Sequence, residues 1–100
     1  MIDELIWLIE KWSIDKGLDK ASPDKQILKV IEEVGEVAGA LAKSDLDNAK
    51  EEIGDVVVTL IILSQQLDMD LYDCLDIAYD KIKDRKGEMK NGVFVKSEDL

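Results

Sequence analysis

Residues 47–67 read DNAKEEIGDVVVTLIILSQQL, and the run from Val56 to Leu63 within them fits either a buried strand or a helix. Its β-branched residues favour a strand by propensity alone. The stretch nevertheless continues on both sides of this run, without a turn signal until Asp68. We therefore expect one helix over about 47–67. Its middle is apolar on every side, which is typical of a helix surrounded by others.

Three further helices are expected, because apolar residues recur at intervals of three and four. Ser22 followed by Pro23 is typical of a helix start, and Asp70 can cap another. The expected helices cover residues 2 to about 16, 23–43, 47–67 and 71–86, before a turn at Asn91-Gly92 and a short extended tail at 93–95. The sequence thus predicts an all-α fold, a four-helix antiparallel bundle-like domain spanning residues 1–100.

The composition excludes several classes of protein. The chain has 100 residues, a formal net charge of −10, no histidine and one cysteine, Cys74. These counts exclude a histidine general base, a zinc finger, an iron-sulfur cluster and an intrachain disulfide. The negative charge argues against nucleic acids and anionic membranes as partners. No secretory signal or membrane-spanning run is visible, so a cytoplasmic protein is expected.

An acidic motif occurs twice, 19 residues apart: residues 32–37 read EEVGEV and residues 51–56 read EEIGDV. If the two central helices are antiparallel neighbours, the motifs face each other at similar height. At 100° per residue, Glu33 and Glu36 lie about 60° apart at one border of an apolar stripe. Glu52 and Asp55 hold the matching border of the next helix. Four carboxylates are therefore expected to converge at the edge of the core.

Carboxylates gathered in this way repel one another unless a cation compensates them. Hard divalent cations such as Mg²⁺ or Mn²⁺ prefer oxygen ligands and would convert the repulsion into binding. The alternative is that the acidic residues only solvate helix surfaces, as single motifs of this kind usually do. Duplication at matched height favours a metal site.

The pattern Glu32-Glu33-x-x-Glu36 followed by Glu52-x-x-Asp55 resembles the signature of the MazG-like all-α nucleoside triphosphate pyrophosphohydrolases. The resemblance extends over nearly the whole chain. It implies that Glu33, Glu36, Glu52 and Asp55 bind Mg²⁺, and that Glu32, just outside these ligands, orients the attacking water. It also implies cleavage of a nucleoside triphosphate to its monophosphate and pyrophosphate. The basic stretch 81–87 departs from the Lys-x-x-Arg-Arg pattern of the larger relatives.

Four other residues are candidates for contact with a nucleotide. Gln26 and Lys29 fall on the same helical flank as the carboxylates, although solvated surface explains them equally well. Lys81 and Arg85 could clamp phosphates, with Arg85 expected on the apolar stripe of the last helix. The alternative is that these cations only offset the dipole at that helix end.

A homo-oligomer, either a dimer or a tetramer, is expected because the helix over 47–67 is apolar all round in a chain with few elements to cover it. Gly35, Gly39 and Gly54 lie inside expected helices, where glycine is unfavourable, so we expect another helix, which could come from a second subunit, to approach them closely. Trp7 and Trp12 could stack on a base, but their helical spacing favours a place in the core.

The expected function is Mg²⁺-dependent hydrolysis of ribo- or deoxyribonucleoside triphosphates, with Mn²⁺ as a substitute cation. One alternative is a related pyrophosphohydrolase specific for phosphoribosyl-ATP, dUTP or dCTP. Another is a non-catalytic helical interaction module whose acidic residues only keep it soluble. The preferred base and sugar, and attack on the α or the β phosphorus, remain open at this point.

Overall fold

A computed structural model describes all residues from 1 to 100 and is mostly helical. Its elements are α1 (Ile2–Asp15), η1 (Leu18–Lys20), α2 (Pro23–Ala42), α3 (Leu46–Gln66), α4 (Leu71–Ile82), β1 (Gly87–Lys90), β2 (Val93–Lys96) and η2 (Ser97–Asp99). The helix expected over 47–67 is thereby confirmed, so the position of the run in a long uninterrupted segment outweighs its strand propensity.

The helix ends lie where local chemistry favours them. Gly17 follows α1 with a φ of 75°, a left-handed conformation that suits glycine at a helix C-terminus. The Asp45 side chain accepts a hydrogen bond from the backbone N of Asn48 at 3.2 Å and so caps α3. Asp70 caps α4 in the same manner, through the backbone N of Tyr72 at 2.7 Å. The end of α1 and the starts of α3 and α4 therefore lie within about one residue of the bounds predicted from the sequence.

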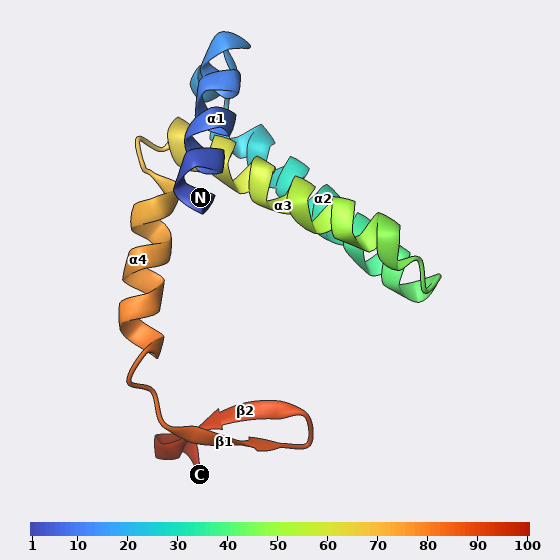
Figure 1. The fold of residues 1–100 in the computed structure, drawn as a ribbon, viewed down its shortest axis with the longest axis vertical. Helices are drawn as coiled ribbons and strands as arrows, with labels where there is room; N and C mark the ends of the chain where they lie inside the picture. The colour runs from blue at the N-terminus through green and yellow to red at the C-terminus, as the bar shows by residue number, and fades with distance from the viewer.

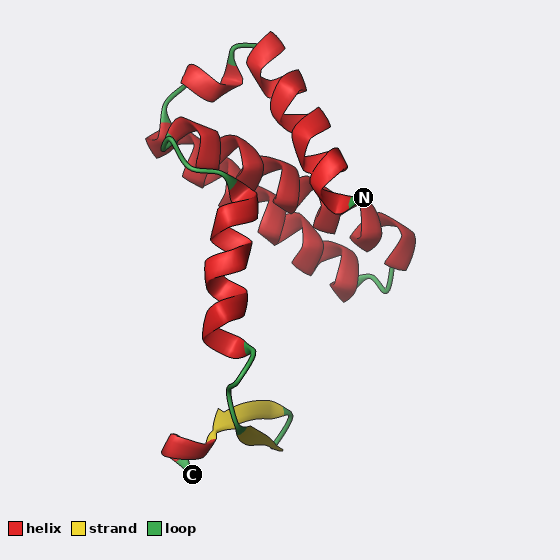
Figure 2. Ribbon diagram, turned by 60° about the vertical axis from the view of Figure 1, so that its left-hand side comes forward, coloured by secondary structure: helices red, strands yellow, loops and turns green.

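An antiparallel pair of long helices, α2 and α3, forms the body of the molecule, and α1 packs across the C-terminal half of α3 (Figures 1 and 2). Glutamine side chains of α3 join these parts: Gln65 donates to the Glu10 carbonyl at 3.2 Å, and Gln66 donates to the Leu18 carbonyl at 3.0 Å. The buried apolar residues are Ile6, Val30, Ala40, Ala49, Ile61 and Ile62. Ile6, Val30, Ile61 and Ile62 form the core where α1, α2 and α3 meet, and Ala40 and Ala49 are buried beside the turn that joins α2 to α3.

The fourth helix does not complete a bundle. It projects from the end of α3 and carries the β-strands at its far end (Figures 1 and 2), and none of its residues is buried. This corrects the expected bundle-like arrangement: three helices pack together, and α4 with residues 83–100 forms an extended arm. Helix α4 also ends at Ile82, before the expected Gly87, so Arg85 lies in a loop and not on a helical stripe.

The arm ends in a small antiparallel hairpin. Asn91 and Gly92 have φ values of 53° and 80°, which fits the two-residue turn that joins twisted strands. The register places Met89 opposite Phe94. The expected turn and extended tail are confirmed. Strand β1, which is short and fully exposed, was not predicted. A side chain at Gly87 would collide with the Val95 carbonyl and the Phe94 ring, so the hairpin needs glycine there.

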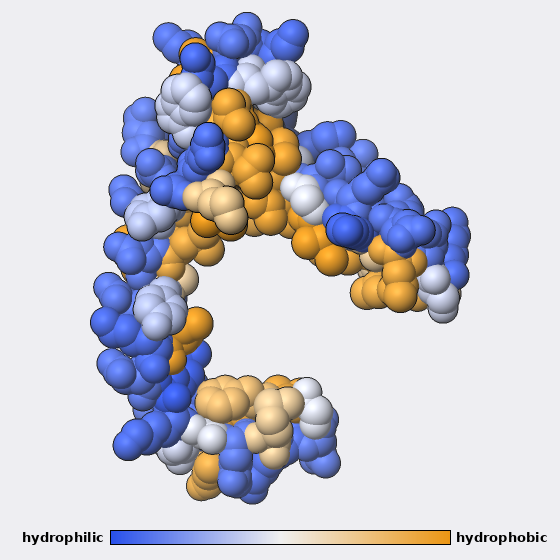
Figure 3. All heavy atoms as spheres, viewed as in Figure 1, coloured by the Kyte–Doolittle hydropathy of each residue, from blue (hydrophilic) through white to orange (hydrophobic).

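Much apolar surface remains uncovered, and the molecule curves around a hollow that this surface borders (Figure 3). One part of that surface, here called the apolar groove, is a cavity of about 410 Å³ between α2 and α3. The apolar groove is lined by Val34, Val37, Ala38, Leu41, Ile53, Val56 and Val57. Within one chain, no atom approaches a side chain placed at Gly35, Gly39 or Gly54, so the expected close approach of a helix is not made by the chain itself. None of the helices combines the length and apolar character needed to cross a membrane.

Candidate functional site

The antiparallel pairing of α2 and α3 brings the two acidic motifs together. Five carboxylates gather here, and we call them the acidic cluster: Glu32, Glu33, Glu36, Glu52 and Asp55. In one set, Glu32, Glu33 and Glu36 each offer an oxygen, and these oxygens lie within 4.8 Å of one another. In the other set, Glu33, Glu52 and Asp55 do the same. Helical spacing within each motif and alignment across the helix pair together account for this convergence.

Glu33 belongs to both sets and is the most enclosed of the five, with 8% of the residue exposed. A carboxylate is seldom buried without a cation or hydrogen-bond donors to compensate its charge. In Glu52, which is half-buried, the oxygen Oε2 is inaccessible and has no hydrogen-bond partner. Glu33 has the Lys29 ammonium as its partner, whereas the Glu52 oxygen has none within the chain. A cluster of carboxylate oxygens of this kind could hold a hard cation such as Mg²⁺ or Mn²⁺.

Crowding of negative charge also changes the acidity of the cluster. The neighbouring Glu36 carboxyl, partial burial and the charges of Glu36 and Asp55 together raise the pKa of Glu52 to about 7. Near neutral pH, Glu52 therefore holds a proton for part of the time. A divalent cation would displace that proton, because carboxylate ligands bind metals in their ionised form.

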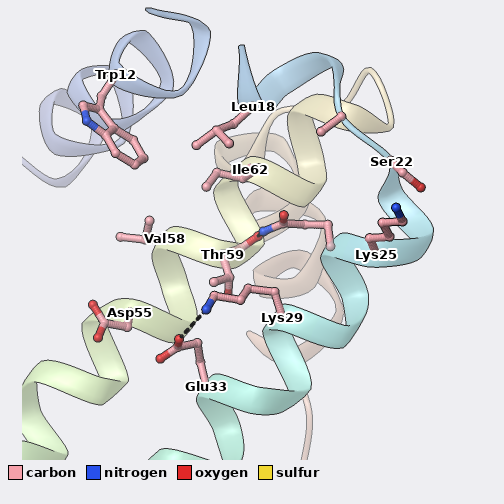
Figure 4. Close-up of a pocket in the computed structure, with 12 residues that line it drawn as sticks. Trp12, Leu18, Ser22, Lys25, Lys29, Glu33, Asp55, Val58, Thr59 and Ile62 are labelled. Carbon is pink, nitrogen blue, oxygen red and sulfur yellow. Dashed lines mark hydrogen bonds and ion pairs between the residues drawn. The ribbon is translucent and has the colours of Figure 1, made fainter. Parts of the chain in front are cut away.

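Lys29 supplies the positive charge nearest to the cluster. Its Nζ lies 3.5 Å from Oε1 of Glu33 (Figure 4) and 3.7 Å from Oε1 of Glu32. The charges of Glu32 and Glu33 raise the pKa of Lys29 above its usual value. The lysine thus stands where a cation is needed, which confirms its expected location on the flank of the carboxylates.

A cavity of about 570 Å³ adjoins the acidic cluster and reaches from Glu33 and Asp55 to α1 (Figure 4). Its far wall is apolar and is formed by Trp12, Val58 and Ile62. Ligand sites in proteins commonly combine such an apolar wall with a few polar groups at one end. The cavity can therefore hold a molecule with a flat apolar part and a charged part.

The sequence predicted the polar residues of this cavity but not its apolar wall. Gln26 lines it as expected, but its Nε2 donates to the Thr59 carbonyl at 3.1 Å, so the amide nitrogen is already used in joining α2 to α3. Trp12 was expected in the core and instead lines the cavity, 48% exposed. Only the crossing of α1 over α3 places it there, and no local pattern reveals that crossing. Trp7 lies outside the cavity, and the Nζ of Lys11 is 4.9 Å from the centre of its ring.

The structure does not bring Lys81 and Arg85 to the acidic cluster. Lys81 lies in the last turn of α4 and Arg85 in the loop that follows, where they border a separate polar cavity of about 530 Å³ together with Lys86 and Lys96. This end of α4 points away from the α2–α3 pair (Figure 1). Within one chain, the phosphate clamp expected from these two residues therefore has no access to the carboxylates.

Comparison with known proteins supports a single family. Residues 21–89 match the model of the MazG nucleotide pyrophosphohydrolase domain, and this range includes all five carboxylates. The chain belongs to the MazG nucleotide pyrophosphohydrolase family.

A second match is to an uncharacterized 18.2 kDa protein from the rep-hol intergenic region of Haemophilus phage HP1, 39% identical over 70 residues. The alignment covers 69% of this chain but 43% of the phage protein, so the chain matches less than half of that relative. No solved structure matches the chain.

Proposed function

We propose that this protein hydrolyses a nucleoside triphosphate to the monophosphate and pyrophosphate with Mg²⁺ held by the acidic cluster. The observation that carries the proposal is the shared position of Glu33 in two sets of carboxylates, next to a cavity large enough for a nucleotide. Family membership supports the same class of reaction. In this reaction, the oxygen of a water molecule bonds to phosphorus, a P–O–P bond breaks, and pyrophosphate leaves.

In this proposal, Glu33, Glu36, Glu52 and Asp55 are the metal ligands. A bound divalent cation, Mg²⁺ or Mn²⁺, would neutralise phosphate charge and lower the pKa of a water molecule. Glu32 is exposed at the edge of the cluster and makes an ion pair with Lys29. From that place its carboxylate can accept a hydrogen bond from the attacking water and orient it.

The polar and apolar ends of the cavity suit the two ends of a nucleotide. Lys29 can exchange its carboxylate partners for a phosphate oxygen, because its ammonium already lies at the border of the cluster. Gln26 keeps its amide oxygen available for a sugar hydroxyl or a base. Trp12 offers an exposed aromatic face against which a base can stack. The proposed orientation therefore places the base toward α1 and the phosphates toward the carboxylates.

We also propose that the chain acts as a single domain within a homo-oligomer, a dimer or a tetramer. Substrate contacts by Lys81 and Arg85 then depend on a second copy, because one chain holds both residues away from the acidic cluster. Their proposed part is to contact the phosphates opposite the carboxylates, where a guanidinium can form two parallel hydrogen bonds.

A panel of ribo- and deoxyribonucleoside triphosphates, assayed for pyrophosphate with Mg²⁺, with Mn²⁺ and with a chelator, tests the proposed reaction. We expect cation-dependent release from at least one member. The panel should include dUTP, dCTP and phosphoribosyl-ATP, because strong preference for one of these would support the more specialised alternative. Binding of cations without pyrophosphate release from any member would overturn the reaction and favour a non-catalytic module.

A Trp12→Ala variant tests the orientation of the nucleotide. Loss of stacking should raise KM for the preferred nucleoside triphosphate and change KM for inorganic triphosphate little. Trp7→Ala is the matched control, because Trp7 lies on the same helix outside the cavity. Equal effects of both variants would contradict the placement of the base beside Trp12.

A further inference from the structure

The apolar wall of the cavity beside the acidic cluster is divided among separate elements of the chain. Trp12 belongs to α1, Leu18 to η1, and Val58 and Ile62 to α3 (Figure 4). The space between the Trp12 ring and the α3 side of the cavity therefore depends on how α1 and η1 are held against α3.

Two neighbouring glutamines of α3 hold these elements. Gln66 donates to the Leu18 carbonyl at 3.0 Å, and Leu18 itself lines the cavity. Gln65 donates to the Glu10 carbonyl at 3.2 Å, on the same helix as Trp12 and two residues before it. Each hydrogen bond thus joins α3 to a segment that forms the facing part of the wall.

The two glutamines are not the side chains that packing alone would favour. Their amide oxygens are inaccessible and have no hydrogen-bond partner, and a buried polar atom in that state destabilises the fold. The Leu18 carbonyl already accepts a hydrogen bond from the backbone N of Ala21 at 3.1 Å. Glu10 lies inside α1, where backbone carbonyls accept the bonds of the helix itself. Apolar side chains of the same size would therefore leave neither carbonyl without a donor.

We propose that Gln65 and Gln66 are positioning residues for the nucleotide. Their hydrogen bonds fix α1 and η1 over α3, so that the Trp12 ring stands at the distance from Val58 and Ile62 that a base requires. Hydrogen bonds can fix such an arrangement because they are directional, whereas hydrophobic contacts are not. The proposal rests on the proposed binding of a nucleotide in this cavity, but it does not depend on hydrolysis.

Calorimetry of nucleotide binding tests the proposal. The variant Gln65→Met/Gln66→Met keeps the length of both side chains and removes both donors. The probes are α,β-methylene-dUTP and α,β-methylene-ATP with Mg²⁺. For each probe that the wild type binds, Kd should rise about fivefold or more, because loss of base stacking typically has at least this effect. The Kd of inorganic triphosphate, which has no base, should change less than about twofold.

Two further variants separate positioning from a general loss of structure. In a Trp12→Ala background, the double glutamine change should raise Kd less than about twofold, because the ring through which it acts is already absent. Ser64→Ala is the matched control and should leave Kd unchanged. Ser64 is buried in the same part of α3, but its Oγ donates to the Leu60 carbonyl of its own helix at 2.8 Å.

Tryptophan fluorescence tests the position of α1 without any ligand. Trp7→Phe leaves Trp12 as the one tryptophan of the chain. In this background, Gln65→Met/Gln66→Met should increase the quenching of Trp12 by acrylamide, whereas Ser64→Ala should not. The melting temperature should stay the same or rise, because the variant removes two buried oxygens that have no partner.

Three results would overturn the proposal. Unchanged Kd and unchanged quenching in the double glutamine variant would show that these side chains only fill the interface. Equal increases in Kd for a nucleotide and for inorganic triphosphate would show an effect outside the base. Full additivity with Trp12→Ala would show that the glutamines do not act through this ring. A wild type that binds an analogue but releases no pyrophosphate would refute only the proposed reaction, whereas one that binds neither analogue would refute both proposals.

Discussion

The α2–α3 pair and the arm formed by α4 and the hairpin differ in where their apolar residues find contacts. In the body, residues such as Val30 and Ile61 are buried against neighbouring helices of the same chain. Along the arm, α4 buries none of its residues. The same amphipathic pattern therefore has two outcomes within one chain: apolar side chains that pack against neighbouring helices and apolar side chains that stay exposed. The acidic cluster lies in the α2–α3 pair, and Lys81 and Arg85, the residues expected to clamp phosphates, lie in the arm.

The largest expected effect belongs to the body. Glu33→Gln should lower kcat/KM about 100-fold or more, because it removes a ligand shared by both sets of carboxylates. Glu51→Gln, an exposed neighbour outside the cluster, is the matched control and should retain most activity. The initial rate of pyrophosphate release at substrate concentrations well below KM gives kcat/KM for each variant. Equal activity of the two variants would separate the acidic cluster from catalysis.

Divalent cations should stabilise the same region. The carboxylates gather only in the folded protein, so Mg²⁺ at 100 times its dissociation constant adds about 2.7 kcal/mol per site to the free energy of unfolding. Thermal melting should rise with Mg²⁺ or Mn²⁺ but not with NaCl of equal ionic strength. The variant Glu36→Gln/Asp55→Asn should melt higher than wild type without metal and should ignore Mg²⁺. An unchanged response to Mg²⁺ in that variant would refute the cluster as the binding site.

A smaller effect is expected from the arm. Arg85→Ala should lower kcat/KM about tenfold, because it removes a phosphate contact but no metal ligand. Mixing Arg85→Ala chains with Glu33→Gln chains should restore activity above that of either variant alone, since a hybrid assembly can hold one site with both groups intact. Activity of the mixture equal to the average of the two would show that Arg85 does not act across subunits.

The smallest expected effect is on the pH dependence of stability in the metal-free protein. The pKa of Glu52 is about 7 in the folded state, whereas a glutamate without interactions has a pKa of 4.5. Between these values the folded protein binds more protons than the unfolded chain, so the free energy of unfolding falls as pH rises from about 4.5 to about 7. Melting curves in a chelator should show this fall. Glu52→Gln should flatten it, and an unchanged slope would contradict the crowding of Glu52.

The sequence predicted the features that depend on local periodicity and missed those that depend on long-range packing. Glu33, Glu36, Glu52 and Asp55 converge as expected, because helical spacing and one antiparallel turn suffice to align them. The position of Trp12 depends on how α1 crosses α3, and the projection of the arm away from the helical body depends on the path of the chain after α3. No local pattern in the sequence indicates either of these arrangements.

The pairing of Lys29 with Glu32 and Glu33 would link the binding of the two proposed ligands, a metal ion and a nucleotide. A metal ion that enters the acidic cluster competes with this ammonium group, so part of its intrinsic affinity is used in displacing it. The displaced ammonium is then available to a phosphate. Metal and nucleotide would consequently raise each other's affinity by the same factor, as thermodynamic reciprocity requires. The lysine thereby offsets part of the negative charge of the cluster, and in the proposed function it would make the binding of metal and nucleotide cooperative.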